Sequence, residues 1–199
     1  MLRRETPQGG PSGYQSPEGF GDVVRGVCLT PGGFFGRLDP EGSLVRPALF
    51  ASSVLYLNLI LDELLQAVWR LEFNYGLLDA ALPGLAVALV LGPLLIAGLS
   101  ALVLTVLDGA PSRRKFGPVF RALGYATAIG LVLWIPYAPF VALPYGLYVA
   151  TFAVKEALSI SWRRAAVAAL APLGAVLLIV LLLVGPTGAY ELLLSPPGE

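Results

Sequence analysis

One segment of the chain places ionisable side chains inside a hydrophobic run, where they could do chemistry in apolar surroundings. The segment LNLILDELLQAVWR, residues 57–70, contains Asn58, Asp62, Glu63, Gln66 and Arg70. At about 100° per residue, these five side chains fall within one arc of a helix and form a polar face. Because ionisable groups in membrane helices are costly and usually face a bundle interior or water, one interpretation is an ion or proton pathway. The other, which we favour, is that the helix reaches the outer membrane boundary at the two carboxylates, with the arginine as their partner.

A second candidate site is a basic loop between two hydrophobic runs. Its cations are Arg113, Arg114, Lys115 and Arg121. Such a loop can bind lipid phosphate or an acidic protein surface, since each basic residue near an anionic leaflet contributes about 1 kcal/mol. The alternative, which we weight more heavily, is a loop of solvated charges that only sets the membrane topology.

A third candidate lies in RGVCLTPGGFFGRLDPEGSLVRPALF, residues 25–50, immediately before the first hydrophobic run. Phe34 and Phe35 alternate with Arg37 and Arg46 in this stretch. Aromatic rings can enter the headgroup boundary while arginines meet anionic lipid, so we expect an interfacial anchor. A plain connecting loop is the alternative, because the glycines and prolines disfavour one regular amphipathic helix.

Enzymatic chemistry finds little support in the residue types. The chain has no histidine and a single cysteine, Cys28. This composition excludes an intramolecular disulfide, a Cys/His zinc site and any mechanism based on a histidine base. We therefore expect no catalytic residues, no metal site and no cofactor.

The composition points to an all-α integral membrane bundle. Of the 199 residues, 56% are hydrophobic and 13% are charged, far from the roughly 25% charged residues of soluble domains. The hydrophobic runs are residues 47–69, 82–107, 119–136, 140–154 and 165–184. Since about 20 helical residues cross the bilayer and satisfy their own backbone, we expect about five transmembrane helices. The short turn WIPYAPF makes the third and fourth runs either two short spans or a re-entrant hairpin.

The distribution of cations predicts the orientation. With five spans, 12 of the 13 Lys and Arg residues fall on the side that carries the N-terminus. By the positive-inside rule, the N-terminus is cytoplasmic and the C-terminus lies outside. The formal net charge is zero, so binding to nucleic acid is not expected.

These patterns divide the chain into four expected parts. Residues 1–27, rich in Gly, Pro and Ser, form a disordered cytoplasmic tail. Residues 28–46 form the interfacial juxtamembrane segment, residues 47–187 the transmembrane bundle, and residues 188–199 a short extracytoplasmic tail.

Several motifs resemble those of a known family. They are LTPGGFF before a hydrophobic run, Phe116 and Phe120 ahead of Gly124-Tyr125, and VKEALSISWRRAAVAAL with Ser161, Arg164 and Ala165. Over residues 28–184 the order of these pieces resembles the bacterial branch of the Yip family, named for binding Ypt/Rab GTPases in eukaryotes. The resemblance implies five spans with a cytoplasmic N-terminus. The eukaryotic Asp-Leu-x-Gly-Pro motif is reduced here to LVLGPLL, with Gly92 and Pro93, so a Rab partner is not expected.

Two functions follow from these expectations. The first is an integral protein of a prokaryotic cytoplasmic membrane that organises the membrane or recruits an unknown protein partner from its cytoplasmic face, in contact with anionic headgroups. The second is a small transporter or channel that uses the polar face at residues 58–66. Small residues four apart, such as Ala88 and Gly92, favour close helix packing and allow a homo-oligomer.

Overall fold

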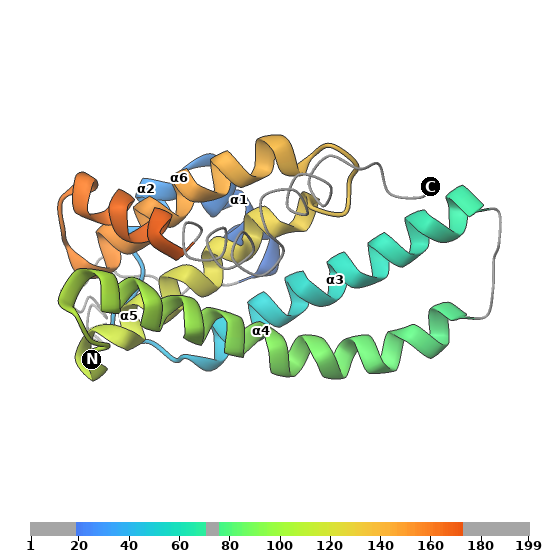
Figure 1. The fold of residues 1–199 in the computed structure, drawn as a ribbon, viewed down its shortest axis with the longest axis horizontal. Helices are drawn as coiled ribbons and strands as arrows, with labels where there is room; N and C mark the ends of the chain where they lie inside the picture. Colours follow the sequence, from blue (N-terminus) through green and yellow to red (C-terminus); the bar gives the residue numbers. More distant parts are fainter. Residues whose placement is uncertain (1–18, 71–75, 173–199) are drawn as a thin grey trace, which may run out of the picture.

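The computed structural model describes residues 19–70 and 76–172, and this part of the chain is helical (Figure 1). In chain order the elements are α1 (Phe20–Leu29), α2 (Pro31–Phe35), α3 (Val45–Arg70), α4 (Gly76–Asp108), α5 (Arg113–Ala126), η1 (Thr127–Val132) and α6 (Pro139–Leu158). A further helical stretch covers residues 162–172. The expected all-α class is confirmed for the described residues.

Helices α3 and α4 form the long hairpin of the structure. Within the described part of the chain, two helical stretches are long and apolar enough to cross a membrane, Val45–Leu65 and Ala81–Asp108, with mean hydropathies of 1.6 and 2.5. At 1.5 Å per residue the first measures roughly 30 Å, the thickness of the hydrocarbon layer. The outer face of α4 exposes many leucines and valines, including Leu82, Val90 and Leu94, which suits contact with lipid.

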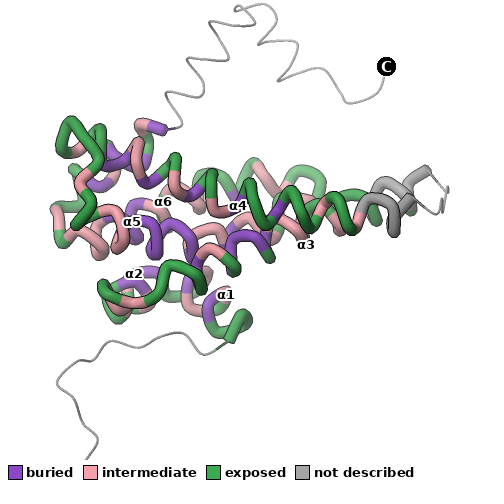
Figure 2. Tube along the Cα trace, turned by 90° about the horizontal axis from the view of Figure 1, so that it is seen from below, coloured by how far each residue is buried: buried purple, intermediate pink, exposed green. Residues whose placement is uncertain are grey.

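Helices α5, η1 and α6 form a shorter second hairpin. Helix α5 continues directly into η1, and the chain then turns through residues 133–138 into α6. Figures 1 and 2 show the α3–α4 hairpin extending well beyond this second hairpin at one end. The tip of the short hairpin is apolar, and Tyr137, Phe140 and Val141 are 75–81% exposed there. Five full spans therefore remain a prediction, and the fifth run, residues 165–184, lies partly outside the described residues.

The N-terminal helices α1 and α2 are part of the packed structure. Val23, Val27 and Phe35 are buried against the bundle, and the Tyr145 hydroxyl of α6 donates a hydrogen bond of 2.7 Å to the carbonyl of Cys28. The boundary that we expected at residue 27 therefore falls inside α1, and only residues 1–18 of the expected tail lie outside the described residues. Burial raises the pKa of the Cys28 thiol above its usual value.

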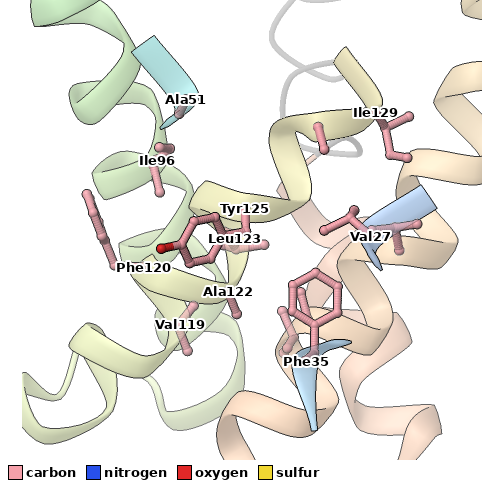
Figure 3. Close-up of a cluster of buried hydrophobic side chains, with 14 of the residues drawn as sticks. Val27, Phe35, Ala51, Ile96, Val119, Phe120, Ala122, Leu123, Tyr125 and Ile129 are labelled. Atoms are coloured by element: carbon pink, nitrogen blue, oxygen red, sulfur yellow. The ribbon is translucent and has the colours of Figure 1, made fainter. Parts of the chain in front are cut away.

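The core centres on α5, which the other helices surround. All residues from Val119 to Tyr125 are buried, and Figure 3 shows Val119, Phe120, Leu123 and Tyr125 of this helix among buried side chains from α1, α2, α3 and α4. This second half of α5 is therefore enclosed by protein, and it carries the charged side chain of Arg121 into the interior.

Candidate functional site at the basic end of the bundle

The four cations of the expected basic loop do not form one cluster. Arg113, Arg114 and Lys115 are exposed in the first turn of α5, where Lys115 Nζ lies 2.9 Å from Asp108 Oδ2. Arg121 lies two turns further along the helix and is only 6% exposed. Three of the cations are therefore available to lipid or a partner, whereas the fourth is enclosed by the protein.

The guanidinium of Arg121 is incompletely satisfied. Its Nη1 donates a hydrogen bond to the Gly42 carbonyl, which ties α5 to the loop that precedes α3. Its Nε is buried and has no hydrogen-bond partner. In the described part of the chain the ion pairs within 4.0 Å are Lys115–Asp108 and Lys155–Glu156, so Arg121 has no such carboxylate partner there. Asp39 and Glu41 interact electrostatically with this guanidinium, so its buried charge is partly compensated although Nε remains unbonded.

A polar hollow of about 190 Å³ lies beside this guanidinium. It is formed where α2, the loop after it, α5 and the end of α6 meet, and its lining residues are Phe35, Gly36, Leu38, Asp39, Pro40, Pro118, Arg121, Ala122, Glu156, Ala157 and Ser159. Asp39 Oδ1 accepts a hydrogen bond of 2.9 Å from the backbone N–H of Glu41, and Glu156 is paired with Lys155. The hollow thus presents one buried cation and two carboxylates.

The polar face expected on α3 borders a second, larger and mainly apolar groove. This groove has a volume of about 660 Å³, lies between α3, α4, the α5–η1 segment and α6, and includes Asn58 and Asp62 in its lining. Asn58 Nδ2 donates a hydrogen bond of 2.9 Å to the Val54 carbonyl, whereas Asn58 Oδ1 is buried without a partner. Asp62 and Glu63 are exposed. The side chains of Gln66 and Arg70 lie outside what the structure describes.

Four hydroxyl groups of the long helices bond to their own helices. Ser52, Ser100, Thr105 and Thr151 each donate to the carbonyl four residues earlier, at 2.7–3.0 Å. This back-bonding satisfies a hydroxyl locally and leaves it no need for a partner across the bundle. These four hydrogen bonds therefore stay within single helices and do not join the hydroxyls into a polar path.

The aromatic residues of the expected interfacial anchor face the protein. Phe35 is buried, and the Phe34 ring packs edge-on against Tyr125 with ring centroids 5.8 Å apart. Phe35 thus leaves little apolar surface for lipid, whereas Phe34 is half-buried, and the interfacial anchor remains a prediction. Arg37 and Arg46 are exposed, and Arg37 Nε donates to the Gly33 carbonyl at 2.9 Å.

The Gly124-Tyr125 pair is a packing motif. A Cβ on Gly124 would lie 2.8 Å from the Cβ of Pro47 and 3.1 Å from its carbonyl oxygen, so a glycine lets α5 approach the start of α3. Tyr125 is buried between Phe34 and Phe50, with ring centroids 5.8 and 5.6 Å away. The pair therefore joins α2, α3 and α5.

Gly92 plays a corresponding role between α3 and α4. A Cβ there would lie 3.0 Å from Ser52 Oγ and 3.1 Å from Ser52 Cα. Of the motif before the last helical stretch, Ala165 is buried, whereas Ser161 and Arg164 are exposed. Gly92 and Ala165 therefore serve helix packing.

Comparison with known proteins gives a match to one family model. The model of the Yip1 domain matches residues 25–184. The chain belongs to the Yip1 domain family. No curated protein and no solved structure matches it. The match begins within α1 and includes Arg121, so the second half of α1, all of α2 and the polar hollow of this Yip-family membrane protein lie inside the domain.

Sequence reasoning missed the hollow around Arg121 because it grouped this residue with the nearby loop cations. One signal was available: VFRALGYA, residues 119–126, places a single cation in an otherwise apolar run. Nothing in the sequence paired that cation with Asp39 and Glu156, which are 82 and 35 residues away along the chain.

Proposed function

We propose that this Yip-family membrane protein organises the membrane or recruits protein partners from its cytoplasmic face. The observation that carries the proposal is that many charged residues belong to elements that meet at one end of the bundle, the end drawn on the left in Figure 1. This basic end is built from α2, the loop before α3, the α4–α5 junction and the end of α6; its exposed or half-buried charged residues are Arg37, Asp39, Glu41, Arg46, Asp108, Arg113, Arg114, Lys115, Lys155, Glu156, Arg163 and Arg164.

The basic end supports a cytoplasmic placement. Cations flanking membrane helices are retained on the cytoplasmic side, so we place the N-terminus in the cytoplasm and the C-terminus outside. The arginine-rich sequence suits a bacterial cytoplasmic membrane. Exposed Arg113, Arg114 and Lys115 would then meet anionic lipid headgroups or an acidic partner surface.

The interior of the bundle supports an interaction role over transport. A channel or carrier needs polar groups that line one path across the membrane. The hydroxyls of Ser52, Ser100, Thr105 and Thr151 are instead satisfied by their own helices. The large groove between the helices is lined mainly by apolar side chains, which favours lipid or helix packing.

The proposal is tested by chemical crosslinking in native membranes, followed by purification and mass spectrometry. The wild-type chain should recover a defined protein partner. Replacing Arg113 and Arg114 by glutamine should reduce that recovery while leaving the amount of folded protein unchanged, because both side chains are exposed. Recovery of the chain alone, or no difference between the two proteins, would contradict recruitment through this end.

A transport function is the alternative, and one observation favours it. Asn58 Oδ1 is buried without a hydrogen-bond partner in the lining of the large groove, which also contains Asp62. Proteoliposomes loaded with a pH-sensitive dye test this alternative directly. A proton flux that Asp62→Asn abolishes would establish the transport function. Equal leakage from protein-free and protein-containing vesicles would contradict it.

A further inference from the structure

We propose that the polar hollow beside Arg121 is a binding site for a phosphoethanolamine group, such as the headgroup of an aminophospholipid. The site goes beyond the proposed function, since it would take this ligand whichever protein the chain recruits. It also differs from the exposed basic residues of α5, because its cation is enclosed between helices.

The phosphate half of the ligand is matched by Arg121. Arg121 as a whole is 6% exposed, and its Nε is buried and unbonded. Arginine presents donors in a planar fork that suits phosphate oxygens, and such charge-assisted hydrogen bonds are among the stronger ones in proteins. One donor, Nη1, already bonds the Gly42 carbonyl, which holds the guanidinium in place beside the hollow that Arg121 lines.

The amine half is matched by the carboxylates. Asp39 and Glu156 line the same hollow as Arg121. A ligand with a negative charge alone would be repelled by these two groups, whereas an ammonium can donate hydrogen bonds to them. A phosphodiester joined to a primary amine therefore fits both kinds of charge.

The size and location of the hollow restrict the ligand further. Its volume of about 190 Å³ is below the roughly 300–1,000 Å³ of pockets for drug-sized molecules, so it admits a small headgroup. Its lining residues belong to the elements of the basic end, where the flanking charges would meet the headgroup layer. Glycerol headgroups provide no cation for the carboxylates, and the trimethylated choline has no N–H to donate.

The test uses the full chain in phosphatidylcholine nanodiscs that contain equal fractions of either phosphatidylethanolamine or phosphatidylglycerol. Native mass spectrometry measures which lipid stays bound. We expect retention of phosphatidylethanolamine over phosphatidylglycerol, and a loss of about tenfold or more in Arg121→Gln. Arg114→Gln is the matched control, since it removes one exposed cation from the same helix. Equal retention of the two lipids, or equal losses in the two variants, would overturn the proposal.

A second variant keeps the proposal testable if Arg121→Gln does not fold. Asp39→Asn leaves Arg121 and its bond to Gly42 in place but weakens the site for the amine. It should abolish the preference for phosphatidylethanolamine while phosphatidylglycerol retention is maintained; an unchanged preference would refute the assignment. Competition with soluble O-phosphorylethanolamine separates the sources of the ligand. Displacement of the lipid by the soluble compound would show that the headgroup alone is recognised. Retention of the lipid would show that the acyl chains also contribute to binding, and both results support the site.

Discussion

Replacing Gly124 by alanine should destabilise the bundle, because the added methyl group has no room. Its Cβ would lie 2.8 Å from the Pro47 Cβ and 3.1 Å from the Pro47 carbonyl oxygen. One contact is with a rigid ring and the other with backbone, so α3 and α5 must move apart. Overpacking of this kind typically costs about 1–3 kcal/mol.

Gly98 of α4 provides the control for this prediction. It is also helical, but a Cβ there would meet nothing within 4 Å. Glycine to alanine improves helix propensity by up to about 1 kcal/mol at either position, and this gain cancels when the two variants are compared. Gly124→Ala should therefore be less stable than Gly98→Ala by about 1–3 kcal/mol.

The assay is unfolding of each purified variant in the same mild-detergent micelles by titration with a denaturing detergent. A second readout is the fraction of protein that elutes as the native species in size-exclusion chromatography. If the two variants were equally stable, the close approach of α5 to Pro47 would be refuted, and with it our explanation of the Gly-Tyr motif.

Three further predictions follow from other parts of the structure. Phe35→Ala should lower the free energy of unfolding by about 3–5 kcal/mol because the ring is buried, whereas Arg37→Ala should change it by no more than about 0.5 kcal/mol. Similar losses for the two variants in detergent unfolding would contradict the burial of Phe35. Asp62→Asn should alter stability by at most about 1 kcal/mol, as for an exposed charge, and a larger loss in the same titration would indicate a buried role. Maleimide should label Cys28 more slowly in the folded than in the denatured protein at neutral pH, because the raised pKa leaves less reactive thiolate; equal rates would be inconsistent with its burial.

The long helices could be predicted from hydrophobic runs alone. The runs at residues 47–69 and 82–107 correspond to α3 and α4, because about 20 consecutive apolar residues leave few alternatives to a membrane helix. The N-terminal helices were harder to predict. Val23 and Val27 of α1 lie four residues apart on one helix face, but the surrounding glycines and prolines concealed so short a pattern.

The candidate sites depended on which part of each helix its neighbours enclose, and the sequence alone does not show this. Arg114 and Arg121 are seven residues apart and lie on nearly the same side of α5, yet a rise of 1.5 Å per residue moves Arg121 about 10 Å further into the bundle. The contacts of Phe34 and Phe35 within the fold were not apparent for a related reason. Their aromatic and basic neighbours suggested a membrane surface, whereas the fold uses the rings to pack against Tyr125 and the core.

Site-specific photocrosslinking in living cells tests the central claim most directly. A photoreactive amino acid would be introduced at Arg114 on the basic end and, as a control, at Val90 on the exposed face of α4. A partner recruited from the cytoplasmic face should give a discrete crosslinked protein from Arg114 and none from Val90. Crosslinks to a protein from Val90 alone, or none from Arg114, would contradict an interaction role for the basic end.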